Sequence, residues 1–313
     1  MLHILLLLLI FILFVVFMSF IMFLMIFYVP PRKEQNPEKI DLPPGRIYEP
    51  FYDSMRQWVI SARNTKHETV SITSFDGLKL TGKYYEYKPG APVEIMFHGY
   101  RGNAERDLAG GMHRAFQLGH SVLIVDQRCA GNSEGNVITF GIREHRDCLD
   151  WVDFAIQYLA SDIRIILTGI SMGASTVLIA SGQKLPVNVI GVVADCGFHS
   201  ARDVILSVAG SMHLPAGVLY PLVKLAAKLF GHFDLEAITP VDAVKKCDIP
   251  VIFFHGLDDD YVPSFMSQIL YDACTSRKKL VLIPGAGHGL SFPVAPERYI
   301  QEIKIFFAES NRN

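Results

Sequence analysis

Short apolar runs alternate with helical stretches from about residue 92 onward, and this alternation is the strongest constraint on the fold. Strands joined through helices form right-handed crossovers, which build a parallel sheet with helices on both faces. The predicted fold class is therefore α/β, with a mostly parallel twisted sheet. Buried strands are predicted over residues 93–97, 121–125, 163–167, 189–194, 250–254 and 279–283, and helices near 104–118, 142–159, 172–183, 265–274 and 295–308.

Two elements are predicted before this pattern begins. Residues 68–74 and 78–87 alternate in character around Phe75-Asp76-Gly77, a turn signal that indicates an antiparallel hairpin. Apolar residues recur at helical spacing between Phe51 and Ala62. They predict a short amphipathic helix that packs on the domain.

The first 29 residues form a hydrophobic segment. From Ile4 to Val29 the chain is apolar except for Ser19, a run of 26 residues, whereas about 20 suffice to cross a hydrocarbon core of ~30 Å. We therefore predict a transmembrane helix over residues 4–29. A cleaved signal peptide is the alternative, but it would need a basic start, a shorter apolar stretch and small residues before the cut.

The residues that follow indicate a linker and an orientation. Five prolines between residues 30 and 44 predict a stiff polar linker over residues 30–49, which ends the helix and spaces the domain from the bilayer. Arg32, Lys33 and Lys39 follow the helix and no Lys or Arg precedes it. The positive-inside tendency then places the domain that follows, residues 50–313, in the cytoplasm, an orientation that rests on these few charges.

One interval departs from the strand–helix rhythm. About 50 residues separate the strands that end at 194 and begin at 250, and prolines divide this interval into apolar helical pieces such as residues 218–230. This is too long for a bare connection in a compact domain, so we predict a helical cap over the site, at about residues 199–246. An ordinary pair of packing helices is the alternative.

Charge and cysteine usage restrict the partners. The chain has 29 Lys plus Arg against 31 Asp plus Glu, without a block of like charge, so it offers no footprint for nucleic acid. The five cysteines are widely spaced, without a Cys-x-x-Cys pair, and are predicted to be buried free thiols. Their odd number favours a reducing compartment. No metal or cofactor site is predicted.

A Gly-x-Ser-x-Gly motif occurs twice, at residues 169–173 around Ser171 and at residues 131–135 around Ser133. Ser171 follows the predicted strand 163–167 and precedes a helical stretch, so it lies on a sharp strand-to-helix turn that exposes its hydroxyl at the carboxyl end of the sheet. Ser133 has neither a strand directly before it nor a clear helix after it, and we predict a loop residue. Ser171 is the candidate nucleophile.

A serine hydroxyl needs a histidine to remove its proton, and that histidine needs a carboxylate to orient it. Residues 258–260 are three consecutive aspartates that follow the predicted strand 250–254, and His288 follows the last predicted strand. Both segments therefore lie at carboxyl ends of strands, as Ser171 does, where open α/β sheets place their sites.

Together these segments resemble the α/β-hydrolase superfamily, and most closely its single-domain serine hydrolases, often found in bacteria, related to esterases and to the catalytic domains of prolyl-oligopeptidase-like enzymes. The likeness runs from about Glu68 to Ala308. It rests on five motifs in family order: HGYRGN at 98–103, DQRCAGNSEG at 126–135, the Ser171 turn, HGLDDDYVP at 255–263 and the His288 loop.

The resemblance implies a triad of Ser171, Asp259 and His288. The family's acid loop, HGxxDxxVP, selects Asp259 from the three aspartates and leaves its neighbours exposed to solvent. It also implies an oxyanion hole formed by the backbone N–H groups of Tyr100 and Met172, aimed at the tetrahedral intermediate.

The second Gly-x-Ser-x-Gly, around Ser133, falls in a family loop that shapes the site without supplying the nucleophile. Cys129 stands in this loop where the family usually has glycine. This departure bears on the shape of the loop and not on the triad.

The predicted function is hydrolysis of an ester-like acyl bond through an acyl-enzyme on Ser171, as in a carboxylesterase or lipase. A serine peptidase or thioesterase with the same triad is one alternative, and a non-catalytic binding protein on a hydrolase fold is another. An apolar cap and a membrane helix indicate a small acyl ester or lipid-like substrate.

Overall fold

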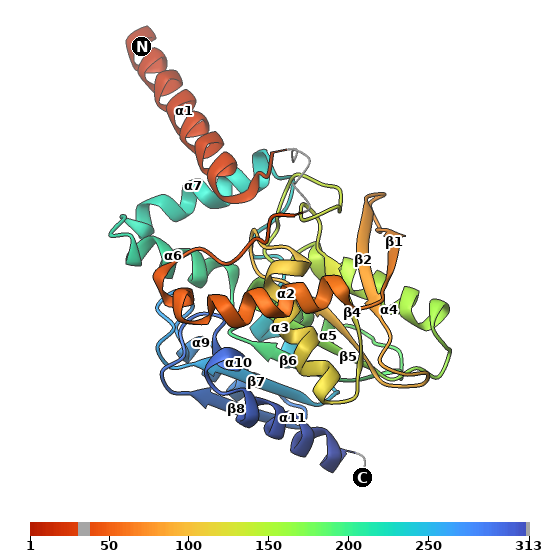
Figure 1. Cartoon of the computed structure of the whole chain (residues 1–313). Helices are drawn as coiled ribbons and strands as arrows, with labels where there is room; N and C mark the ends of the chain where they lie inside the picture. The colour runs from red at the N-terminus through yellow and green to blue at the C-terminus, as the bar shows by residue number, and fades with distance from the viewer. Residues whose placement is uncertain (31–37, 311–313) are drawn as a thin grey trace.

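A single eight-stranded sheet runs through the molecule, in the order β1-β2-β4-β3-β5-β6-β7-β8. The computed structural model describes residues 1–30 and 38–310 (Figure 1). β1 pairs with β2, and β2 with β4, in antiparallel fashion, whereas every pairing from β4 to β8 is parallel. The predicted α/β fold class is confirmed. The strands are β1 (Glu68–Thr73), β2 (Lys79–Tyr85), β3 (Val93–Phe97), β4 (Ser121–Asp126), β5 (Ile165–Ile170), β6 (Val189–Asp195), β7 (Val251–Gly256) and β8 (Lys278–Ile283).

Helices cover both faces of this sheet, because its central strands are buried on both sides. α4, α5, α8 and α9 pack on one face, and α2, α3, α10 and α11 pack on the other. In chain order the helices are α1 (Leu2–Met22), the π-helical turn η1 (Phe23–Phe27), the 3-10 helix η2 (Arg46–Phe51), α2 (Tyr52–Asn64), α3 (Ala104–Gln117), α4 (Glu144–Tyr158), α5 (Met172–Ser181), α6 (Ala201–Ser211), α7 (Ala216–Leu229), α8 (Pro240–Val244), α9 (Phe265–Ala273), α10 (Ser291–Val294) and α11 (Pro296–Ser310).

β5 lies about two residues later than its apolar run predicts. It begins at Ile165 and continues through Thr168 and Gly169 to Ile170. Backbone pairing explains the extension, since Gly169 is in register with Phe97 of β3 and with a residue of β6. The strand therefore reaches the residue directly before Ser171.

The N-terminal apolar run forms one helix from Leu2 to Phe27, which is long and apolar enough to cross a membrane. Figure 1 shows α1 projecting away from the body, with its C-terminal end beside α7. Within η1, Phe23 and Phe27 are buried, and Tyr28 forms an isolated antiparallel bridge with Val137.

The end of this helix therefore packs directly on the domain. The apolar end of the helix gains more by burial against α7 and Phe233 than by exposure to water. Residues 31–37 of the predicted linker lie outside the described residues, so a linker that spaces the domain from the bilayer stays a prediction.

The interval predicted as a cap, residues 199–246, divides into two parts. α6 and α7 stand over the carboxyl ends of the strands, where they contact each other and α7 contacts η1. α8 instead packs against α5 within one of the helix layers. Only α6 and α7 therefore cover the region of Ser171.

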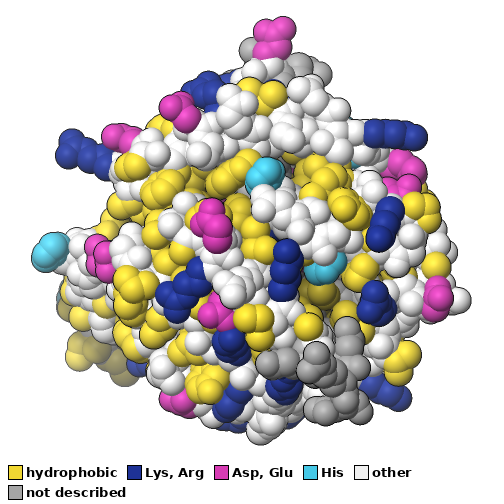
Figure 2. Space-filling model, turned by 60° about the horizontal axis from the view of Figure 1, so that its bottom comes forward, with side chains coloured by type: hydrophobic (Ala, Val, Ile, Leu, Met, Phe, Trp, Pro, Cys, Tyr) yellow, Lys and Arg dark blue, Asp and Glu magenta, His cyan; other side chains and the backbone are white. Residues whose placement is uncertain are grey.

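Charged side chains of both signs are interspersed over the face shown in Figure 2, with no large area of a single sign. This matches the near-zero net charge of the whole chain, −2 at pH 7.

Candidate active site

Ser171 lies on the turn between β5 and α5, in a backbone conformation that non-glycine residues rarely adopt. Its φ is 56° and its ψ is −118°, so the turn stores strain. A Cβ on Gly169 would lie 2.2 Å from the carbonyl oxygen of Gly173, and a Cβ on Gly173 would lie 2.1 Å from that of Phe97. Both glycines of the motif are thus required for the turn to close against β3.

His288 connects Ser171 to Asp259. Nε2 of His288 lies 2.9 Å from Oγ of Ser171, and its Nδ1 lies 2.8 Å from Oδ2 of Asp259. The three side chains come from the ends of β5, β7 and β8, at the same edge of the sheet. The structure thus brings together the three residues that the sequence named.

Asp259 is buried and held in its charged form. Its Oδ1 accepts hydrogen bonds from the backbone amides of Tyr261 and Val262, at 3.0 and 2.8 Å. Burial alone raises the pKa of this carboxyl, but hydrogen bonds from His255 and His288 outweigh burial and keep the pKa well below its ordinary value. Asp259 is therefore a carboxylate that can orient His288 and stabilise a positive charge on it.

Tyr100 and Met172, whose backbone amides were predicted to form the oxyanion hole, line the same cavity as Ser171. Met172 follows Ser171 at the first position of α5, and Tyr100 follows Gly99, where an added Cβ would lie 3.5 Å from that of Ser171. Within the part of the chain that the structure describes, neither the Met172 nor the Tyr100 amide donates to another group of the protein. Both are available to a bound oxygen atom.

The second Gly-x-Ser-x-Gly has a structural role, as its loop position predicted. Oγ of Ser133 donates to the backbone oxygen of Asp126 at 2.6 Å and accepts from the amide of Thr81 at 2.9 Å. Cys129, in the same loop, has a φ of 66°. Glycine adopts that conformation most easily, which accounts for the family's usual residue there.

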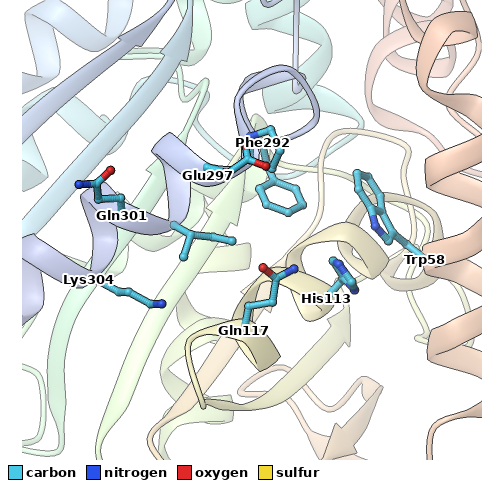
Figure 3. A pocket seen from close by; sticks show the side chains of 9 residues that line it. Trp58, His113, Gln117, Phe292, Glu297, Gln301 and Lys304 are labelled. Carbon is cyan, nitrogen blue, oxygen red and sulfur yellow. The ribbon is translucent and has the colours of Figure 1, made fainter.

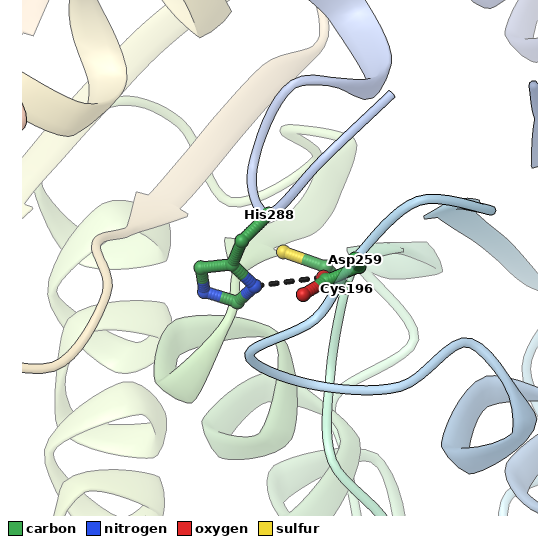
Figure 4. A group of neighbouring side chains, drawn as sticks. All are labelled: Cys196, Asp259 and His288. Atoms are coloured by element: carbon green, nitrogen blue, oxygen red, sulfur yellow. Dashed lines mark hydrogen bonds and ion pairs between the residues drawn. The ribbon is translucent and has the colours of Figure 1, made fainter. Parts of the chain in front are cut away.

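Cys196 lies beside the Asp259–His288 pair (Figure 4), close enough for the three side chains to be considered as metal ligands. Metals bind the thiolate form of cysteine. Burial, with a contribution from Asp195, raises the pKa of the Cys196 thiol well above its ordinary value, which disfavours that form. All five cysteines are free and buried, as predicted.

Ser171 opens on two cavities. A larger one, of about 700 Å³, is bordered by residues 43–48, α2 and α3, and includes His288 and the charged side chains of Arg106 and Asp258. A smaller one, of about 210 Å³, lies under α6 and α7 and is lined almost wholly by apolar side chains. The hydroxyl thus lies between a mixed polar space and an apolar one.

A third hollow, of about 540 Å³, lies between α2, α3 and α11 (Figure 3). His113 stacks near Trp58 at its edge, with 6.0 Å between ring centroids. Its lining includes neither Ser171 nor His288, so we do not assign it to the reactive site.

The fold and the strained serine turn together define the α/β-hydrolase class. The chain belongs to the alpha/beta hydrolase family, whose family model matches residues 95–302. It is 28% identical to the uncharacterized protein YqkD of Bacillus subtilis over 219 residues, which cover 69% of this chain and 71% of that one.

Two further comparisons bear on the fold and the N-terminal helix. The uncharacterized membrane protein YNL320W of Saccharomyces cerevisiae is 29% identical over 55% of this chain and 56% of its own. The esterase Pf2001 of Pyrococcus furiosus superimposes with a TM-score of 0.64 at 23% identity, covering 80% of this chain and 94% of that one. At this identity the likeness shows that the two chains share the α/β-hydrolase fold.

The sequence did not reveal two parts of the site. His255, the first residue of the acid-loop motif, has Nε2 3.2 Å from Oδ2 of Asp259. Met25 and Ile26, from the end of the N-terminal helix, line the apolar cavity. The position of His255, four residues before Asp259, could have indicated their contact. No local sequence pattern indicated that Met25 and Ile26 line the cavity.

Proposed function

We propose that the protein is a membrane-anchored serine hydrolase that cleaves carboxylic esters through an acyl-enzyme on Ser171. The observation that carries this proposal is the pair of hydrogen-bond distances from His288, 2.9 Å to Ser171 and 2.8 Å to Asp259. A base within hydrogen-bond reach of a nucleophile, itself oriented by a carboxylate, is the arrangement that activates a serine.

Ser171 Oγ bonds to the ester carbonyl carbon while its proton passes to Nε2 of His288. The carbonyl oxygen becomes an oxyanion, which the amides of Tyr100 and Met172 stabilise by hydrogen bonds. The bond from carbon to the alcohol oxygen then breaks, and the alcohol leaves with the proton from His288. Water, deprotonated by His288, attacks the acyl-enzyme and releases the carboxylic acid and Ser171.

The anchor is the helix from Leu2 to Phe27, which we propose crosses the bilayer once. Its length and composition support this, as does the relative described as a membrane protein. Lys39 and the basic residues just before it follow the helix, so we propose that the catalytic domain faces the cytoplasm. Protease added to intact cells should leave the catalytic domain uncut. Digestion of the domain in this experiment would show that it faces the outside of the cell.

Active-site labelling tests the nucleophile. A fluorophosphonate probe should label the full-length protein and Ser133→Ala, and should fail to label Ser171→Ala, whose esterase kcat should fall by at least ~10³-fold. Labelling that persists in Ser171→Ala and disappears in Ser133→Ala would overturn the assignment.

The leaving group is tested separately. p-Nitrophenyl esters should be hydrolysed faster than aminoacyl-p-nitroanilides, because the proposal assigns an alcohol as the leaving group. The reverse preference would make the protein a peptidase. Absence of both turnover and labelling would make it a binding protein on a hydrolase fold.

A further inference from the structure

The apolar cavity beside Ser171 is built partly from the N-terminal helix. α6 and α7 supply one side of it, including Ala209 and Leu219, and the helix end supplies Met25 and Ile26. Ser171 and Met172 also line it. A segment long enough to cross a bilayer therefore continues as a wall of the candidate active site.

Hydrogen bonds fix this wall to the loop that carries the Tyr100 amide. The hydroxyl of Tyr100 donates to the backbone oxygen of Ile26 at 2.6 Å. The guanidinium of Arg101 donates to the backbone oxygens of Met25 and Tyr28 at 2.9 and 3.0 Å. Irregular backbone at the end of the helix leaves these oxygens free to accept, so the helix end and the Tyr100 loop form one unit.

A second set of backbone bonds holds the same segment from the other side. The amide of Val29 donates to the oxygen of Asn136 at 2.8 Å, and the amide of Ile138 donates to the oxygen of Phe27 at 2.9 Å. The helix end is therefore paired in strand-like fashion with the domain, and its position relative to Ser171 is defined.

The rim of the cavity is apolar and exposed. Met212 and Leu214, which line the cavity between α6 and α7, have 62% and 43% of their surface exposed, and Val218 on α7 has 70%. Large exposed apolar side chains beside a membrane-spanning helix mark a surface that contacts lipid. α1 leaves the domain beside α7, the helix that carries Val218 (Figure 1).

We propose that the substrate is a single-chain lipid ester of a polar alcohol, which enters from the bilayer along the end of the N-terminal helix. This inference rests on the proposed function. The acyl chain occupies the apolar cavity with its carbonyl at Ser171, and the alcohol part lies in the larger cavity beside Arg106 and Asp258.

The cavity volume sets the length of chain that it encloses. A methylene occupies about as much space as a water molecule, ~30 Å³, so 210 Å³ encloses about seven carbons of one chain. A longer chain extends past Met212 into the lipid. The site therefore favours acyl groups of about eight carbons or more over acetyl groups.

The test uses the full-length protein in phosphatidylcholine vesicles that contain 1-monodecanoylglycerol, with fatty acid release as the readout. p-Nitrophenyl acetate, which does not need the apolar cavity, is measured on the same vesicles. Met25→Trp fills the cavity from the helix, and Ala209→Phe fills it from α6. Both should lower the ratio of the monodecanoylglycerol rate to the acetate rate by at least about tenfold.

Leu13→Trp is the matched control, because Leu13 lies on the same helix with 59% of its surface exposed and does not line the cavity. It should leave the rate ratio unchanged. Equal ratios in Met25→Trp, Ala209→Phe and Leu13→Trp would overturn the assignment of the cavity. The ratio is taken within one preparation, so partial misfolding of a variant does not imitate the effect.

Surface dilution separates entry from the bilayer and entry from water. At a constant total concentration of monodecanoylglycerol, adding phosphatidylcholine should lower the rate, because the substrate is diluted within the membrane. An unchanged rate would overturn entry from the bilayer.

The two proposals fail in different ways. Hydrolysis of p-nitrophenyl acetate without hydrolysis of monodecanoylglycerol would reject the lipid substrate and leave the serine hydrolase intact. A protein that hydrolyses neither and is not labelled at Ser171 by fluorophosphonate would reject both.

Discussion

Nε2 of His255 lies 3.2 Å from Oδ2 of Asp259, the carboxylate oxygen that also lies 2.8 Å from Nδ1 of His288. His255 is completely buried, and its Nε2 also lies 2.7 Å from the backbone oxygen of Val262. Because a carbonyl oxygen only accepts, Nε2 carries the proton. We therefore expect His255 to act as a positioning residue that restrains the carboxylate facing His288.

Replacing His255 should lower catalysis with little change in substrate binding. A hydrogen bond to a charged group contributes ~1.5–3 kcal/mol, so we expect His255→Phe to lower kcat per labelled active site by about 10- to 100-fold, with KM nearly unchanged. His255→Gln keeps an N–H donor and should recover part of the loss. His113→Phe, at an exposed histidine, is the control, and a wild-type kcat in His255→Phe would reject the positioning role.

Breaking a buried ion pair within the core should strongly destabilise the fold. Glu94 on β3 pairs with Arg114 on α3, and both are almost completely buried. Glu94→Gln leaves the guanidinium without its counter-charge, which should lower the free energy of unfolding by ~3–5 kcal/mol. The half-buried pair between Arg63 and Glu105 is the contrast, where Glu105→Gln should cost less than ~1 kcal/mol. Denaturant unfolding of detergent-solubilised protein measures both.

Glu94 should also make the free energy of unfolding depend on pH in the acid range. Burial raises the pKa of Glu94, but Arg114 and His120 outweigh burial and lower the pKa to about 2 from 4.5. A lowered folded-state pKa contributes stability above the unfolded-state value, and this contribution is lost as the pH falls from about 4.5 towards 2. The stability gap between wild type and Glu94→Gln should therefore narrow over this range. A constant gap from pH 6 to pH 2.5 would show that Glu94 does not carry the effect.

A methyl group at Gly173 should prevent the serine turn from closing. The added Cβ would meet the backbone oxygen of Phe97 at 2.1 Å, and the nearest atoms are all backbone atoms of Phe97 and His98, so no flexible side chain can give way. Gly173→Ala should lower stability by several kcal/mol and abolish esterase activity. Gly210→Ala, in α6 with open space around the new Cβ, should raise stability by up to ~1 kcal/mol. Thermal unfolding and activity assays compare the two, and an active, stable Gly173→Ala would contradict the geometry.

Local sequence information predicted the candidate triad because each part of it lies directly after a strand. Ser171, Asp259 and His288 follow three apolar runs, and parallel strands carry their carboxyl ends to one edge of the sheet. Chain order and strand periodicity brought three segments to one edge, with Ser171 and His288 more than 100 positions apart. The resemblance to the family's acid loop then selected Asp259 from three consecutive aspartates. The strand boundaries were less accurate, because backbone pairing extends β5 through the weakly apolar Thr168 and Gly169.

Only the tertiary structure decided what surrounds the triad. Glu94 is a charged residue within the apolar run of β3, and the sequence did not indicate its partner. Glu94 and Arg114 come together only because α3 packs on the sheet. In the same way, hydropathy identified the N-terminal helix but did not indicate that its end packs on the domain. The contact of Ile26 with Tyr100 joins residues 74 positions apart and depends on the docking of one complete element on another. Periodicity in the sequence shows which face of a helix or strand is apolar. It does not show which other element that face packs against, because this depends on the complete folded structure.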